Sequence, residues 1–250
     1  MSEATPAVVL AGGKPVTTPD GRTTPRALVE VHGRPMVERV ADALREARSV
    51  GDVLIVGDIP PVSGCLRAAD RGGFVENILA GIEAFPNAGH VLLATCDTPF
   101  LTPASVDDFA ERALALDADM VYPFVPVRLC YERFPGIKRT SLRLREGAMT
   151  GGNLVLARPA FLIQQRERTA EAYAARKSPF RLARMIGPGM TLRLAIGVTI
   201  WPSLVGVPEL ERAISNLLGG RARGVCSAYP ELATDVDRPE ELAALGGATS

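Results

Sequence analysis

A glycine turn near the beginning of the sequence is the first feature that could take part in chemistry. Gly12 and Gly13 follow a short apolar run that ends in Leu10-Ala11, so we expect a buried strand to enter a tight loop there. Backbone N–H groups in such a loop, with no side chains in the way, can bind a polyphosphate. A plain tight turn is the competing interpretation. Neither the P-loop pattern nor the Rossmann pattern GxGxxG occurs, which disfavours ordinary kinases and dehydrogenases.

Basic side chains follow this turn and recur in two later clusters. Lys14, Arg22 and Arg26 stand in a segment rich in Thr, Pro and Gly, where their charges could neutralise a triphosphate and its transition state. The later clusters could bind an anionic acceptor, but a solvated face is the favoured interpretation of both. They comprise Arg128, Lys138, Arg139, Arg143 and Arg145 in the first, and residues 177–181 in the second.

Two acidic positions, far apart in the chain, could bind a divalent cation. Asp97 follows a buried apolar run, and a carboxylate just past a strand can hold a cation beside a phosphate. Its alternative is a turn or a helix cap. Asp235 and Asp237 are two positions apart near the end of an expected strand, so they could share a face, and one of them could instead cap a helix that begins at Pro239. Because Mg²⁺ usually takes one or two carboxylates, we expect Asp97 and Asp237 to bind it.

Strands and helices alternate in the first half of the sequence, which predicts βαβ units and a mostly parallel sheet. In such a sheet, ligands bind at the carboxyl ends of the strands, where Gly12, Gly13 and Asp97 are all expected. The expected strands are 7–10, 52–57, 90–96 and 120–125, and the expected helices are 35–47, 76–85 and 103–116.

The second half of the sequence is less regular. Residues 137–144 alternate as an exposed strand would, and we expect residues 154–157 to pair with them. No linker divides the chain cleanly, so residues 1–250 are interpreted as a single domain with a helical insertion at about 159–222. The remaining expected elements are helices at 159–184, with a break near 178–179, at 209–218 and at 239–245, and a strand at 224–229.

Composition narrows the class of partner and compartment. Lys plus Arg equals Asp plus Glu, at 28 each, and this balance argues against nucleic acid as the main partner. The four cysteines form no CxxC pair, which favours reduced thiols in a cytoplasm, and we expect no signal peptide. The apolar segment 185–207 contains charge, proline and glycine, so it predicts no membrane span. It could instead cover an apolar acceptor or join two copies of the chain in a homo-oligomer.

Four motifs in order give the sequence a family resemblance. They are residues 10–13 (LAGG), 25–36 (PRALVEVHGRPM), 96–99 (CDTP) and 235–240 (DVDRPE). Together they resemble the nucleotidyltransferase superfamily, on its molybdenum-cofactor guanylyltransferase-like (MobA-like) side, from about residue 8 to residue 242. The resemblance implies a three-layer, Rossmann-like α/β fold with a mostly parallel mixed sheet and an inserted helical segment.

The resemblance also implies roles for individual residues. Ala11, Gly12 and Gly13, directly after Leu10, would hold the nucleotide, and Asp97 and Asp237 would bind Mg²⁺. Arg26 stands where the family places a lysine that contacts the phosphates, and arginine keeps the charge without being equivalent. Asn153 resembles the family's Gly-Asn segment near the acceptor. Asn77 stands where the family reads the base, although a helix cap is the slightly favoured interpretation.

The implied reaction is attack of an acceptor on the α-phosphorus of a nucleoside triphosphate, with loss of pyrophosphate. The acceptor would be a small molecule that carries a phosphate or a hydroxyl group. Two alternatives remain at this point. One is a glycosyltransferase that uses a nucleotide sugar, since those enzymes also use Asp-x-Asp with a divalent ion. The other is a nucleotide-binding module without activity, which the arginine at position 26 and the unusual loop 14–25 suggest.

Overall fold

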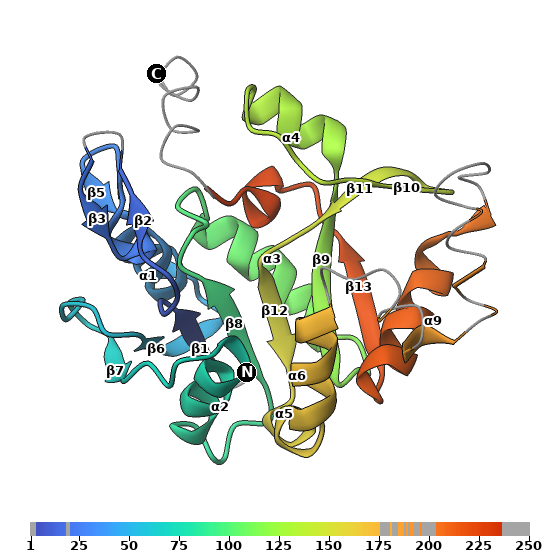
Figure 1. The fold of residues 1–250 in the computed structure, drawn as a ribbon, viewed down its shortest axis with the longest axis horizontal. Helices are drawn as coiled ribbons and strands as arrows, with labels where there is room; N and C mark the ends of the chain where they lie inside the picture. Colours follow the sequence, from blue (N-terminus) through green and yellow to red (C-terminus); the bar gives the residue numbers. More distant parts are fainter. Residues whose placement is uncertain are drawn as a thin grey trace.

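A single mixed sheet forms the centre of the molecule (Figure 1). The computed structural model describes residues 4–18, 21–175 and 204–236, together with 181, 185–187, 189, 191, 192 and 196. Within them the sheet has nine strands, in the order β10-β11-β9-β12-β8-β1-β6-β7, and β13 pairs with β9. The strands are β1 (Thr5–Leu10), β6 (Val50–Val56), β7 (Leu66–Ala68), β8 (Val91–Thr95), β9 (Met120–Pro126), β10 (Leu142–Leu144), β11 (Gly147–Gly151), β12 (Leu154–Ala157) and β13 (Ala222–Cys226).

Helices cover both faces of this sheet, which confirms the predicted three-layer α/β class. Helices α1 and α3 pack on one face, and α2, α5 and α6 pack on the other. The helices are α1 (Met36–Glu46), α2 (Phe74–Glu83), α3 (Pro103–Leu114), α4 (Val127–Arg133), α5 (Pro159–Gln164), α6 (Arg166–Ala175) and α9 (Val207–Leu218), with 3₁₀ turns η1 (Arg26–Leu28) and η3 (Pro230–Ala233). Two small hairpins, β2 (Val16–Thr17) with β3 (Thr23–Thr24) and β4 (Glu30–Val31) with β5 (Arg34–Pro35), lie in the loop before α1.

The first half of the fold is parallel, as the alternating pattern predicted. Strand β1 pairs in parallel with β6 on one side and β8 on the other. Its residues Ala7, Val8 and Val9 have no exposed surface, because alternate side chains pack under helices on opposite faces. Strands covered on both faces are read as continuous apolar runs, which is why this region could be predicted from sequence.

The predicted pairing of 137–144 with 154–157 is wrong. Only Leu142–Leu144 forms a strand, β10, and it pairs with β11 through a two-residue connection. A local hairpin closes a much shorter loop than the predicted pairing would, so its entropic cost is lower. Strand β12 instead runs antiparallel between β8 and β9. Strands β11 and β12 therefore follow one edge of β9 in succession, and β13 lies on the other edge.

Helices α5, α6 and α9 lie between β12 and β13 in the sequence (Figure 1). Helix α6 is anchored to the end of α9, because Arg168 donates hydrogen bonds to the carbonyl groups of Asn216 and Leu217. Most of the apolar segment 185–207 and the expected helix at 239–245 lie outside the described residues. Among the helices that the structure describes, none has the length and apolar character required to cross a bilayer.

Candidate active site

The glycine turn lies where three parallel strands end. The amide of Ala11 donates to the carbonyl of Val56 at 2.8 Å, and the amide of Cys96 donates to the carbonyl of Leu10 at 3.2 Å. These bonds tie the exits of β6 and β8 to the exit of β1. Since Asp97 directly follows Cys96, the structure brings the predicted phosphate loop and the predicted metal ligand to one edge of the sheet.

A cavity of about 420 Å³ opens beside this turn. It is lined by Leu10, Gly12, Gly13 and Lys14 of the turn, and by Asp70 and Asn77 from the adjoining segment, among others. A methyl group at Gly12 would lie 2.4 Å from the Asp70 carboxylate and 2.5 Å from the Asn77 amide nitrogen. Only glycine fits there without displacing those side chains. Arg22, by contrast, is exposed in the β2–β3 hairpin and does not line this cavity.

Asn77 has a role that the helix-cap interpretation missed. Helix α2 begins at Phe74 and its N-cap is Gly73, so Asn77 lies inside the helix and is buried. Its side chain donates to Asp70 at 2.9 Å and accepts from the amide of Arg71 at 2.7 Å. The Asn77 hydrogen bond lowers the pKa of Asp70, as do the amides of Gly72 and Gly13. Asn77 and Asp70 together fix the loop that faces Gly12.

Asp70 itself was not predicted. A single aspartate in an exposed loop has no distinctive pattern, and the only local signal was the Gly72-Gly73 pair that follows β7. The cavity is closed on another side by the rings of Phe74 and Tyr173, which stack with centroids 4.3 Å apart and planes 8° apart. Tyr173 belongs to α6, so the segment between β12 and β13 contributes a wall to this cavity.

Asp97 is buried and only partly neutralised. A guanidinium nitrogen of Arg26 lies 3.2 Å from its Oδ2, and its side chain is 17% exposed. Its other oxygen, Oδ1, is buried without a hydrogen-bond partner. Burial raises the pKa of the Asp97 carboxyl, and the negative charge of Asp235 raises it further, whereas Arg26 acts in the opposite direction. A buried carboxylate with an unused oxygen is suited to receive a cation.

Asp235 is the carboxylate that the structure places beside Asp97. The amide of Val236 donates to the Asp97 carbonyl at 2.8 Å, which ties the two segments together. The prediction that Asp235 lies at the end of a strand is wrong, because β13 ends at Cys226 and η3 intervenes. The strand-alternation argument therefore does not apply. Asp237, the predicted second ligand, lies outside the described residues.

Arg139 pairs with Asp235, and it was not singled out from the first basic cluster. Its Nη1 forms an ion pair with Asp235 Oδ1, and its side chain is only 9% exposed. The solvated-face interpretation of this cluster therefore fails for Arg139, although it suits the exposed Lys138 beside it. Arginine can be buried when a carboxylate neutralises it, but a single sequence does not show which distant residue is the partner.

Asn153 lies between β11 and β12, at the point where the chain leaves the edge of β9 and enters the space beside β8. Its amide donates to the carbonyl of Leu232 at 2.8 Å, and its side-chain nitrogen is buried without a partner. The preceding residue must be small, since a methyl group at Gly152 would lie 2.7 Å from the Leu232 carbonyl oxygen and 2.7 Å from Pro123. The predicted Gly-Asn segment thus adjoins the end of β8, which precedes Asp97.

Comparison with known families decides the class of this protein. Residues 7–192 match the model of the MobA-like NTP transferase domain. The chain belongs to this family. It is therefore a nucleotidyltransferase by family, as the motifs predicted.

Individual relatives of this MobA-like chain agree with that result. A hypothetical transferase from Thermus thermophilus is 37% identical, with a TM-score of 0.83 over 96% of this chain and all of that one. CMP:2-keto-3-deoxy-manno-octonic acid synthetase, in complex with CTP, shares the fold at 13% identity, with a TM-score of 0.56 over 97% of this chain and 96% of that one. A 3-deoxy-manno-octulosonate cytidylyltransferase from Serratia proteamaculans is 27% identical over 120 residues, 44% of this chain. The chain spans about half the length of that curated relative.

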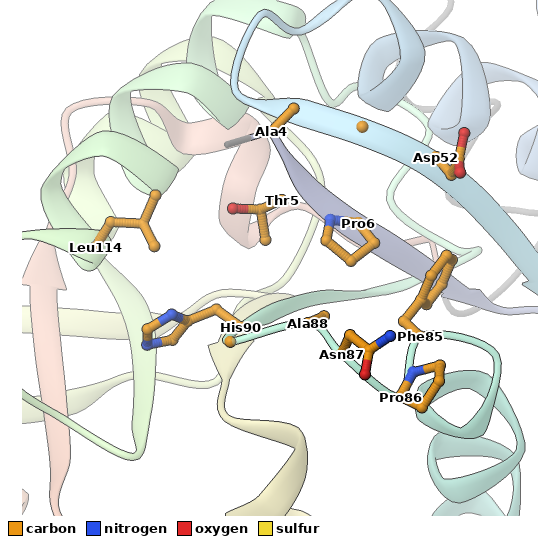
Figure 2. Close-up of a pocket in the computed structure, with 12 residues that line it drawn as sticks. Ala4, Thr5, Pro6, Asp52, Phe85, Pro86, Asn87, Ala88, His90 and Leu114 are labelled. Atoms are coloured by element: carbon orange, nitrogen blue, oxygen red, sulfur yellow. The ribbon is translucent and has the colours of Figure 1, made fainter. Parts of the chain in front are cut away.

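A larger cavity of the MobA-like chain, about 660 Å³, lies away from these residues (Figure 2). It is formed at the opposite edge of the sheet, where Thr5 begins β1, Asp52 lies early in β6 and His90 precedes β8. Burial, and to a smaller extent the charge of Arg158, lowers the pKa of His90. None of the residues predicted for chemistry lines this cavity, so size alone does not identify the active site.

Proposed function

We propose that this protein transfers a nucleoside monophosphate from a nucleoside triphosphate to a small acceptor and releases pyrophosphate, with the help of Mg²⁺. The acceptor carries a phosphate or a hydroxyl group. The observation that carries the proposal is the buried Asp97, which has one unpartnered oxygen, lies beside a second carboxylate, Asp235, and shares its sheet edge with the Gly12-Gly13 turn.

The turn and its cavity supply the nucleotide site in this proposal. The backbone N–H groups at Gly12 and Gly13 contact the phosphates, since no side chain blocks their approach. Lys14 lines the same cavity and adds positive charge. Arg26 stands between this loop and Asp97, so its guanidinium stabilises charge that develops at the transferred phosphorus.

The carboxylates at the end of β8 fit a magnesium ion. Mg²⁺ requires one or two carboxylates together with water and substrate phosphates, and Asp97 and Asp235 supply that number. Among the described residues there is no group of three or more His, Cys, Asp or Glu that could hold a metal. In the proposal Asp97 is one ligand and the segment 235–237 supplies the other, as Asp235 or as the originally predicted Asp237. The bound ion would neutralise phosphate charge and act as a Lewis acid.

The chain itself needs to supply no covalent nucleophile. Cys96 is the thiol nearest to Asp97 in sequence, and burial raises its pKa to about 12, so it stays protonated at neutral pH. A protonated thiol is a poor nucleophile. The proposed transfer is therefore direct: the protein holds the acceptor in line with the α-phosphorus, and Arg26 stabilises the charge of the transition state. A phosphate acceptor is already ionised and requires no general base.

CTP is the first triphosphate to examine, because the curated relative is a cytidylyltransferase. The four cysteines are free thiols, which supports a reducing compartment such as the cytoplasm as the place of action. The glycosyltransferase alternative is weakened by the family assignment, since residues 7–192 match an NTP transferase model. The inactive-module alternative is the one that the experiment must address.

The test combines binding with turnover. Thermal shift with CTP, GTP, ATP and UTP, each with Mg²⁺, identifies the preferred base, because a ligand that binds only the folded state raises its apparent stability. Pyrophosphate release is then followed over a panel of phosphorylated and hydroxylated acceptors. We expect release that depends on both an acceptor and Mg²⁺. Binding without release across the panel would leave a nucleotide-binding module, and release of a nucleoside diphosphate from a sugar nucleotide would favour a glycosyltransferase.

A further inference from the structure

Four charged side chains form a connected row at the end of β8. Arg26 pairs with Asp97 at 3.2 Å, and Arg139 pairs with Asp235. The two pairs are coupled, because the charge of Asp235 acts on Asp97 and because the Val236 amide binds the Asp97 carbonyl. Two carboxylates therefore adjoin each other, and each is balanced by its own guanidinium.

The two guanidinium groups differ in position and in burial. Arg26 follows the glycine turn, on the side of the proposed nucleotide site, and its side chain is 35% exposed. Arg139 precedes β10, on the side of β9 and β11, and its side chain is 9% exposed. Its Nε is buried without a hydrogen-bond partner. A buried arginine with an unused donor normally has another acceptor to serve.

Charge balance indicates when that donor would be used. The two arginines contribute two positive charges and the two aspartates two negative charges, so the row is neutral by itself. A divalent cation between the carboxylates would leave the row with two excess positive charges. Asp235 would then be shared with the cation, and its attraction for Arg139 would weaken.

We propose that Arg139 receives an anionic oxo group of the acceptor, a phosphate or a carboxylate, and that it does so only after a divalent cation has bound at Asp97 and Asp235. This inference rests on the proposed function and narrows its acceptor to anionic compounds. The guanidinium is suited to the task because its planar donors match phosphate and carboxylate oxygens. Asp235 occupies it meanwhile, so the ion pair acts as a placeholder for the acceptor.

A purely structural role for Arg139 makes the opposite prediction for metal affinity. If Arg139 only anchors Asp235, then Arg139→Gln releases that carboxylate and weakens metal binding. If Arg139 competes with the cation for Asp235, the same variant binds the metal more tightly, by about 3- to 10-fold, because the carboxylates lose a neutralising charge. Anion binding should fall in that variant at the same time, so the two measurements move in opposite directions.

Calorimetric titration of the full chain with Mn²⁺, and then with inorganic phosphate or acetate, tests this without any nucleotide. The wild-type protein should bind phosphate only with the metal present. Arg139→Gln should bind the metal at least as tightly as the wild type but phosphate at least about 10-fold more weakly. Lys138→Gln, which removes the same charge from the exposed neighbour, should change neither. Arg139→Lys keeps the charge without the fork and should bind phosphate with intermediate affinity. The acetate arm shows whether a carboxylate is accepted as well as a phosphate.

Two further variants keep the result unambiguous. Arg26→Gln reports whether phosphate has bound on the nucleotide side: phosphate binding lost there but kept in Arg139→Gln overturns the inference and leaves the nucleotide proposal intact. If Arg139→Gln fails to fold, the double variant Arg139→Gln with Asp235→Asn removes both charges of the pair, and phosphate binding should still be lost. Weaker metal binding by Arg139→Gln, or phosphate binding that is independent of the metal, would overturn the inference.

Discussion

The two sides of the charged row come from parts of the sheet that are built differently. On the nucleotide side, parallel strands β1, β6 and β8 end together, and the glycine turn and Asp97 follow directly from them. On the acceptor side, antiparallel β11 and β12 meet at Gly152-Asn153, and Asp235 arrives from the segment after η3. The first side is therefore placed by short connections, and the second by contacts between segments far apart in sequence. Changes on the second side should disturb folding more, and changes on the first side should disturb binding more.

Asp97 joins the two sides, so its loss should have the largest effect. Asp97→Asn keeps the shape of the side chain but removes the charge that would face the cation. We expect pyrophosphate release to fall by at least about 100-fold, because electrostatic stabilisation of the reacting group is removed. The measurement is the rate of release at saturating Mg²⁺ and triphosphate.

Stability supplies the control for this variant. Burial raises the pKa of Asp97, so the ionised form is disfavoured in the folded state, and stability falls as the pH rises through that raised pKa. The asparagine side chain of the variant has no such titration. The urea midpoint of Asp97→Asn at pH 7 should therefore not lie far below that of the wild type. A large drop in the midpoint would mean that lost activity reflects unfolding.

Gly152→Ala should have the second-largest effect, on folding. The added methyl group would lie 2.7 Å from a backbone carbonyl oxygen of Leu232 and 2.7 Å from Pro123, and the backbone cannot easily yield. We expect the free energy of unfolding to fall by roughly 1–3 kcal/mol. The neighbouring Gly151→Ala is the matched control, since its methyl group would have no neighbour within 4 Å. Equal urea midpoints for the two variants would contradict the account of this crossing.

The same contrast between the two sides explains how far sequence could lead. The buried runs 7–10 and 90–96 and the residues that follow them were predictable, because parallel strands with short exits place Gly12 and Asp97 at one edge of the sheet. The β10–β11 hairpin was missed because residues 147–151 contain two glycines and carry no clear strand pattern. Strand β12 was predicted, but its partners were not.

The acceptor side resisted prediction for a different physical reason. Arg139 was one of several cations in its stretch of sequence, and its burial depends on the ion pair with Asp235. Asp70 was missed in the same way, because its importance lies in the hydrogen bond from Asn77 and in the close approach of Gly12. Such pairs are tertiary contacts, and neither partner carries a local signal of the other.

Gly12→Ala should have a smaller effect than Gly152→Ala on folding, and it should act mainly on binding. Its methyl group would meet the ends of the Asp70 and Asn77 side chains, which can move, and moving them would disturb the wall of the 420 Å³ cavity. We expect nucleoside triphosphate affinity to fall by about 10-fold, near 1.4 kcal/mol. The measurement is calorimetric titration with the preferred triphosphate.

Gly89→Ala is the control for this variant, because its methyl group would have no neighbour within 4 Å and it lies at the opposite edge of the sheet. We expect wild-type affinity from it. Unchanged affinity in Gly12→Ala would show that the nucleotide does not depend on this turn, and the assignment of the nucleotide side would have to be given up.

Asn77→Ala should produce the smallest change that separates the two sides, a shift in pH dependence. Asn77 is the largest cause of the lowered pKa of Asp70, whose ordinary value is 3.8. A lowered carboxyl pKa contributes stability that is complete above the unfolded value and is lost as pH falls through the folded value. The variant should therefore be less stable than the wild type at pH 7, and part of that difference should disappear in acid. The pH-dependent part should be small because Asp70 is largely solvated. Urea unfolding between pH 3 and 7 measures it, and in an Asp70→Asn background the effect of Asn77→Ala should no longer vary with pH. A difference that varies equally in both backgrounds would assign the titration to another carboxylate and would remove Asp70 from the account of the nucleotide side.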